Sequence, residues 1–88
     1  MTITVQRGTP TAEKRRRREL RKQITGLSMK FMPTDDDIEV IGVLQKEYYA
    51  LLVFAESECA TLTAAEKTHL NAFDKIFGRA VTDGPKTP

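Results

Sequence analysis

The feature that most constrains this chain is one segment, residues 34–62, whose pattern predicts a single long helix. Thr34 is placed to cap the helix, and three consecutive aspartates at 35–37 complement the positive end of its dipole. Apolar residues then recur at alternating spacings of three and four, the pattern of a heptad seam. With the polar Gln45 at one of the seam positions, the seam consists of Ile38, Ile41, Gln45, Tyr48, Leu52, Ala55, Cys59 and Leu62. Val40, Leu44, Leu51 and Phe54 widen this face on one side, so it is too broad for a single partner helix to cover.

A basic helix is predicted before this segment. Thr11 is placed to cap a helix that begins at about Ala12, and Pro33 disfavours helical geometry at the residue before it, which ends the helix. One apolar stripe follows the helical period. It consists of Leu20, Ile24, Leu27 and Phe31.

A third helix is predicted after the long segment. Thr63 and Glu66 have the spacing of a capping box, which marks a helix start. The inward stripe of this helix is Leu70, Phe73, Ile76, Phe77 and Ala80. The three elements predict an all-α fold, with a long antiparallel helical hairpin and a basic N-terminal helix that dimerise into a helical bundle.

Eighty-eight residues are enough for one small domain. We expect a single helical domain over residues 11–82. In residues 1–10, Ile3 and Val5 alternate with polar residues as in a short strand, and Gly8 and Pro10 follow. Because no partner strand is evident elsewhere in the sequence, a flexible N-terminal tail is predicted. Residues 83–88 begin with an Asp-Gly-Pro turn sequence, which predicts a disordered C-terminal tail.

The small size of the chain favours association with a second copy. A short chain buries a smaller share of its surface than a long one, and its one cysteine and one histidine cannot form a disulfide or a complete zinc site. Residues 48–55 are apolar nearly all round, which predicts burial on most sides. We therefore expect a homodimer, with intramolecular core as the alternative. Its expected interface is Ile41, Leu44, Tyr48, Leu51, Leu52, Ala55 and Cys59.

Charge is divided unevenly along the chain, whose net charge is +2. Residues 1–32 hold nine basic and two acidic groups, whereas residues 33–88 hold five basic and ten acidic groups. Seven of the cations lie between Lys14 and Lys22. This run could bind nucleic acid, and a small DNA-binding accessory protein is the alternative function. Neither interleaved aromatic residues nor a helix-turn-helix pattern accompanies the run, so contact with an acidic surface is favoured over direct nucleic-acid binding.

The sequence predicts neither enzyme activity nor a cofactor or metal. His69 has no nucleophile to pair with, Cys59 is expected to act as a small apolar residue, and the aspartates at 35–37 point in different directions around a helix. No signal peptide is evident, and the longest apolar run, residues 48–55, is less than half of a membrane span. We expect a cytoplasmic protein without contact to a membrane.

Four short motifs carry a resemblance to a known family. They are Glu19-Leu20-Arg21, Gly26-Leu27-Ser28, Pro33-Thr34-Asp35 and Leu70-Asn71-Ala72-Phe73-Asp74-Lys75-Ile76-Phe77-Gly78. In order and in helix type this set resembles the TraM family of quorum-sensing antiactivators, which show E-L-R, G-L-T/S, P-T-D and a C-terminal L-N-x-L-x-x-I-L-G. The connection at 59–66 is shorter and the run at 15–18 more basic than in the better-known members, so the resemblance is to a divergent or second TraM-type protein.

The resemblance implies a function that the residues alone do not. TraM proteins are helical dimers that bind TraR, a LuxR-type activator that responds to an acyl-homoserine lactone. They prevent it from holding its promoter DNA and so restrain conjugal transfer of plasmids. We expect this chain to bind a TraR-like activator through the first helix and its junction with the second, although the apolar part of that stripe could equally be core. The expected partner-binding residues are Leu20, Ile24, Leu27, Pro33, Thr34 and Asp35.

Overall fold

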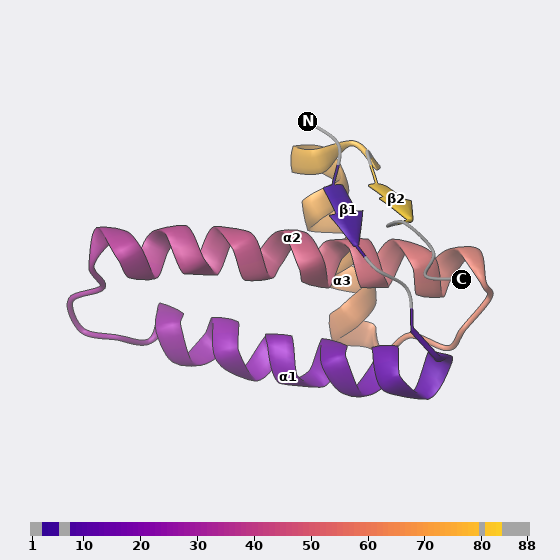
Figure 1. Cartoon of the computed structure of the whole chain (residues 1–88), viewed down its shortest axis with the longest axis horizontal. Coiled ribbons are helices and arrows are strands. Elements are labelled where there is room, and N and C mark those ends of the chain that lie inside the picture. The colour runs from indigo at the N-terminus through magenta and orange to yellow at the C-terminus, as the bar shows by residue number, and fades with distance from the viewer. Residues whose placement is uncertain (1–2, 6–7, 80, 84–88) are drawn as a thin grey trace.

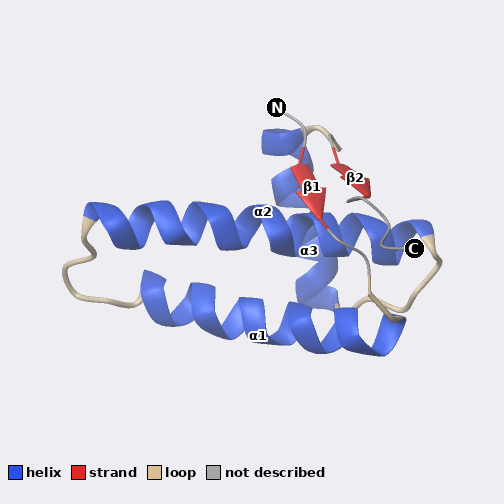
Figure 2. Cartoon of the chain, viewed as in Figure 1, coloured by secondary structure: helices blue, strands red, loops and turns tan. Residues whose placement is uncertain are grey.

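A computed structural model describes residues 3–5, 8–79 and 81–83. These ranges contain the helices α1 (Pro10–Ser28), α2 (Asp35–Ser57) and α3 (Ala64–Phe77), and the short strands β1 (Ile3–Val5) and β2 (Val81–Asp83) (Figures 1 and 2). The chain is mostly helical, which confirms the main part of the all-α prediction. The two strands depart from it.

The longest helix, α2, organises the molecule, since it contacts every other described element. In Figure 1, α1 lies beside it in the antiparallel direction, whereas α3 crosses it steeply. The α1–α2 connection lies at one end of the molecule, and α3 and the strands gather along the other half of α2 (Figure 1). The two halves of α2 therefore have different surroundings.

Two of the three predicted helix starts are confirmed. The Thr34 hydroxyl accepts a hydrogen bond from the Asp37 amide, and the Asp37 carboxylate accepts one from the Thr34 amide, which completes a capping box. Thr63 and Glu66 form the same reciprocal pair at α3. Each box satisfies two backbone donors that a helix start would otherwise leave without a partner.

The start of α1 differs from the prediction. Its cap is Thr9, whose hydroxyl accepts a hydrogen bond from the Ala12 amide, and Pro10 occupies the first turn. Proline is well suited to this position because its fixed φ is helical and its missing N–H is not needed there. The assignment of Thr11 as the cap was therefore wrong by two residues.

The end of α2 also differs from the prediction. The helix stops at Ser57 rather than near Leu62, and Cys59 has a left-handed φ of 58°. A non-glycine residue in that region cannot continue a right-handed helix. Cys59 is exposed, so its assignment to the heptad seam was wrong. Leu62 is buried, but it lies in the segment that connects α2 to α3 and not in the helix.

The N-terminal segment contains a strand where the sequence was read as a flexible tail because no partner strand was found. Ile3 lies opposite Val81 in a parallel pair between β1 and β2, and its side chain is buried in the core. The prediction that residues 1–10 form a flexible tail without a partner strand was therefore wrong for Ile3–Val5. Of the predicted C-terminal tail, residue 83 belongs to β2, and residues 84–88 lie outside the described residues.

The core is centred on the C-terminal part of α2, where all eight residues from Tyr48 to Ala55 are buried. Tyr48 and Tyr49 pack against Phe73 and Phe77 of α3, with ring centroids 5.2–6.4 Å apart. Edge-on and tilted arrangements of this kind are favourable for aromatic pairs. The segment that we expected to need a second chain is thus covered by its own chain.

This burial overturns most of the expected dimer interface. Tyr48, Leu51, Leu52 and Ala55 are intramolecular core. Cys59 is exposed in the turn after α2, and only the half-buried Ile41 and Leu44 are accessible to a second copy. The prediction of a dimer interface failed because the two strands, which were not expected, complete the cover that α1 and α3 give to this face of α2.

Candidate functional site

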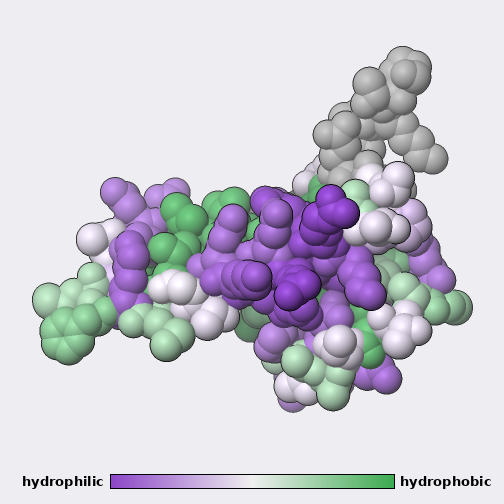
Figure 3. Space-filling view, turned by 90° about the horizontal axis from the view of Figure 1, so that it is seen from below, coloured by the Kyte–Doolittle hydropathy of each residue, from purple (hydrophilic) through white to green (hydrophobic). Residues whose placement is uncertain are grey.

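Large apolar side chains are exposed at the end of the molecule where α1 turns into α2. We call this set the tip surface. Its members are Met29, Phe31, Met32, Ile38, Val40 and Val43, and their exposed fractions run from 46% to 97%. In Figure 3, apolar residues are visible at this end, beyond the hydrophilic side chains that cover α1. Exposed apolar residues scattered singly need no explanation, but a group of this kind marks an interaction site.

The tip surface has an acidic rim. Asp35, Asp36 and Glu39 are exposed at the start of α2 among the apolar residues. The ammonium group of Lys30 lies nearby and forms an ion pair with the Asp37 carboxylate at 3.1 Å. An apolar surface with negative charge around it complements a partner that is apolar at its centre and basic at its edge.

Local structure holds the base of the tip surface in place. Met29 caps the end of α1 through hydrogen bonds from its amide to the carbonyls of Leu27 and Thr25. On the other side, the Thr34 amide and the Lys30 ammonium group hold the Asp37 carboxylate and lower its pKa. Fixed helix ends on both sides of a short connection reduce the entropy that binding must remove.

The expected partner-binding residues are divided by the fold. Leu20 has no exposed surface and is core, and Ile24 and Leu27 are half-buried, with Ile24 packed against the core. Pro33, Thr34 and Asp35 are exposed in the α1–α2 connection and the start of α2. The structure therefore retains the junction as a candidate surface and removes Leu20 from it.

Sequence reasoning missed most of the tip surface. Met29 and Met32 were not assigned a role, and Phe31 was placed in the inward stripe of the first helix, although that helix ends three residues earlier. Val40 was read only as a widening of the long apolar face. One signal in the sequence could have indicated this surface. Large apolar residues are concentrated around Pro33, and the connection there is too short to fold back and cover them.

The seven cations of α1 are divided between two directions. Three point inward and form ion pairs: Arg16 with Glu47 at 2.5 Å, and Arg17 and Arg21 with Glu66 at 2.7 and 3.5 Å. These pairs join α1 to α2 and to α3. The other four form what we call the basic face. They are Lys14, Arg15, Arg18 and Lys22, all exposed.

Glu66 is the centre of the buried ion pairing. Burial by itself would raise the pKa of Glu66, but the hydrogen bonds from Arg17 and from the Thr63 amide, together with the charges of Arg17 and Arg21, lower it below its usual range. A carboxylate at this position stays ionised at neutral pH, and it serves as both the helix cap and the partner of Arg17.

His69 takes part in packing. Its Nδ1 lies 2.9 Å from the Tyr48 hydroxyl, and its ring lies edge-on to Tyr48 with the centroids 5.7 Å apart. The buried Tyr48 has a raised pKa because burial disfavours the phenolate. A neutral phenol and an imidazole in this arrangement satisfy each other at the α2–α3 contact, in agreement with the interpretation of His69 as an ordinary helix residue.

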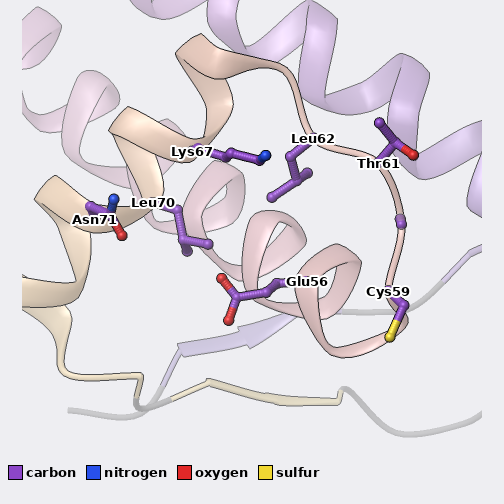
Figure 4. Close-up of a pocket in the computed structure, with 8 residues that line it drawn as sticks. Glu56, Cys59, Thr61, Leu62, Lys67, Leu70 and Asn71 are labelled. Atoms are coloured by element: carbon purple, nitrogen blue, oxygen red, sulfur yellow. The ribbon is translucent and has the colours of Figure 1, made fainter.

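A shallow hollow of about 490 Å³ lies between the end of α2 and α3 (Figure 4). Leu62 and Leu70 line it, and Glu56, Cys59 and Lys67 bring polar groups to its edge (Figure 4). The Glu56 carboxylate is held by Arg79 at 2.7 Å. Within the described ranges no hydrogen bond links the Cys59 thiol to the Glu56 carboxylate or to the Lys67 ammonium group.

The described part of the chain contains no group of three or more histidine, cysteine, aspartate or glutamate side chains that could hold a metal ion. None of the helices in those ranges combines the length and the apolar character needed to cross a membrane. The expected absence of a catalytic group is not tested by these observations.

Comparison with known proteins adds no relative. No family model matches the chain, and neither a curated protein nor a solved structure is significantly similar to it.

Proposed function

We propose that this chain is a quorum-sensing antiactivator of the TraM type, which binds a TraR-like, LuxR-type activator in the cytoplasm and blocks its DNA binding. It acts by stoichiometric contact and not by catalysis, and the consequence is repression of plasmid conjugal transfer. The single observation that carries the proposal is the tip surface, an exposed apolar group with an acidic rim at the junction of α1 and α2.

The resemblance and the tip surface support each other. Gly26-Leu27-Ser28 ends α1 and Pro33-Thr34-Asp35 begins α2, so two of the four family-like motifs flank Met29, Phe31 and Met32 of the tip surface. These motifs end one helix and cap the next, and they thereby hold the connection that carries Phe31.

The acidic rim fits the proposed partner. A DNA-binding domain presents basic groups to phosphates, because neutralising phosphates supplies most of the affinity for DNA. A surface with Asp35, Asp36 and Glu39 around apolar side chains could occupy such a domain when it is free of DNA. A ligand that binds only the DNA-free activator shifts the equilibrium away from the promoter complex.

The test uses two matched substitutions of exposed isoleucines. Ile38 belongs to the tip surface and is 58% exposed, whereas Ile76 on α3 is 70% exposed and lies outside it. We expect Ile38→Asp to abolish binding of a TraR-like activator, measured by co-purification without DNA, and to restore the gel shift of the activator on its promoter. Ile76→Asp should leave both unchanged. Equal effects of the two substitutions, or no complex with the unmodified chain, would refute the proposal.

The homodimer stays part of the proposal. The exposed Ile38, Val40 and Val43 and the half-buried Ile41 and Leu44 are available to a second copy. Light scattering of the unmodified chain at micromolar concentration should give the mass of a dimer. A monomeric mass would refute the homodimer. The proposed contact with the activator is tested separately by the co-purification.

A further inference from the structure

We propose that the basic face of α1 is a second binding surface, which holds the sugar-phosphate backbone of nucleic acid without regard to sequence. This goes beyond the proposed function, because the surface lies outside the tip and needs no activator. It rests on how the fold uses the cations of α1.

The fold leaves four of these cations without an ion-pair partner in the described part of the chain. Arg16, Arg17 and Arg21 are engaged by Glu47 and Glu66, as described above. The remaining four, at positions 14, 15, 18 and 22, make no recorded ion pair or hydrogen bond. Glu19 is the acidic residue beside them, and its carboxylate lies 3.5 Å from Arg16. The positive charge of the basic face is therefore available to a ligand.

The four cations form one continuous row. Positions three or four apart on a helix are neighbours on its surface, with Cβ atoms about 5–6 Å apart, so Lys14, Arg18 and Lys22 follow one another along α1. The row spans about 12 Å of the helix axis. Hydrophilic side chains dominate the middle of the α1 side of the molecule (Figure 3).

The row continues into a shallow hollow at its C-terminal end. Arg18, Arg21 and Lys22 line the hollow together with Thr25 and Gly26. A Cβ added to Gly26 would meet no atom within 4 Å, so the helix backbone is open to a close approach there. A phosphate in this hollow would find two cations without an ion-pair partner, Arg18 and Lys22, and the Thr25 hydroxyl within two helical turns.

The composition of the face, now that three of the seven cations are known to be paired within the chain, favours nucleic acid over an acidic protein, which reverses the preference predicted from the sequence. Protein interfaces depend on a central group of buried aromatic or apolar anchors, and the exposed residues of α1 from Thr11 to Gly26 include Ala12 as their one apolar side chain. Duplex DNA carries one charge per about 1.7 Å of axis and needs no apolar anchor. The face offers no aromatic ring for stacking and no second element for groove readout, so the contact is with the backbone and not with base edges.

Fluorescence anisotropy of labelled 24-base-pair duplexes of two unrelated sequences, titrated with the full chain alone, tests this directly. We expect both duplexes to bind equally at 50 mM salt. With at most four phosphates neutralised, affinity should fall by up to about a hundredfold between 50 and 200 mM salt. The variant K14Q/R15Q/R18Q/K22Q should lose this binding while its circular dichroism spectrum stays helical.

Two matched double substitutions of lysine distinguish binding by the basic face from a general effect of the net charge of the chain. K14Q/K22Q and K67Q/K75Q each remove two exposed helical lysines, and only the first pair should weaken binding, by about tenfold. Equal losses in the two variants, or no binding at 50 mM salt, would overturn the proposal. Poly-glutamate that competes as well as a duplex of equal charge would also overturn it and assign the face to an acidic protein. Because no activator is present, these results do not depend on the proposed antiactivator function.

Discussion

The two halves of α2 have different environments although both are rich in apolar residues. In the N-terminal half, residues 35–47, Ile38, Val40 and Val43 are largely exposed. In the C-terminal half, residues 48–57, every residue from Tyr48 to Ala55 is buried. The first half has α1 beside it, whereas the second is also covered by α3, β1 and β2.

This difference shows that apolar residues on one continuous helix can serve two purposes. The C-terminal half uses them for the core, where burial contributes about 25 cal/mol for each Å² of apolar surface removed from water. The N-terminal half keeps them in contact with water, which adds nothing to folding. Their exposure is consistent with binding and is the physical basis of the proposed contact with an activator.

The largest expected effect comes from placing the same charge in each half. Leu52 has no exposed surface and Val43 is 61% exposed. Leu52→Asp buries an unpaired carboxylate and should cost more than about 4 kcal/mol, enough to unfold a domain of this size. Val43→Asp should leave the thermal midpoint nearly unchanged but weaken activator binding. Circular dichroism melts of both variants test the contrast, and a folded Leu52→Asp variant would show that the C-terminal half is less buried than described.

The next effect separates core from surface on α1. Leu20 is fully buried and Ile24 is partly buried, so Leu20→Ala should cost about 3 kcal/mol and Ile24→Ala distinctly less. If Leu20 is core, inhibition of the activator should fall only in proportion to the folded fraction. Lost inhibition at an unchanged melting temperature would instead return Leu20 to the partner-binding surface.

The buried ion pair that links α1 to α3 gives a somewhat smaller effect. Glu66→Gln keeps the capping box with Thr63, because glutamine also serves at that position, but leaves Arg17 buried without its counter-charge. We expect a loss of roughly 2–3 kcal/mol, below the usual cost of breaking a buried ion pair, because the glutamine oxygen can still accept a hydrogen bond from Arg17. Arg16→Gln breaks the more exposed pair with Glu47 and should cost less than about 1 kcal/mol. Urea denaturation of both variants measures the difference, and equal losses would contradict the burial of Glu66.

The same pair predicts a dependence on pH. Because the pKa of Glu66 is lower in the folded chain than in the unfolded one, the unfolded state takes up a proton more readily. The stabilisation is fully present above the ordinary glutamate value of about 4.3 and declines as the pH falls below it. The stability of the unmodified chain should therefore drop more steeply below about pH 4 than that of Glu66→Gln.

Much of the helical framework could be predicted because its signals are local. The caps at Thr34 and Thr63 depend on residues within one turn, and both were confirmed with complete capping boxes. The end of α2 was missed because the apolar spacing continues past the helix to Leu62, which reaches the core from the connecting segment. Spacing alone cannot distinguish an apolar residue that is buried as part of a helix from one that is buried as part of the segment after it.

The strand pair and the tip surface could not be predicted for a different reason. Ile3 and Val81 lie at opposite ends of the sequence, and two three-residue strands carry too little pattern to indicate such a distant partner. Their pairing helps to cover the C-terminal half of α2 and thereby decides which apolar residues are core. Which ones stay exposed, Val43 among them, thus depends on contacts that no local pattern specifies.

The smallest effect tests whether the helix backbone at Gly42, in the N-terminal half of α2, is open. Gly42 in α2 and Gly26 in α1 both lie within helices, and a Cβ at either position would meet no atom within 4 Å. Glycine in a helix interior is about 0.5–1 kcal/mol less stable than alanine, so Gly42→Ala and Gly26→Ala should each raise the melting temperature by about 3–6 °C. Melts at two protein concentrations, tenfold apart, measure this. If Gly42→Ala lowers the melting temperature at the higher concentration while Gly26→Ala raises it, a second copy of the chain approaches Gly42 too closely for a methyl group, and the proposed contact between copies extends to the helix backbone at this position.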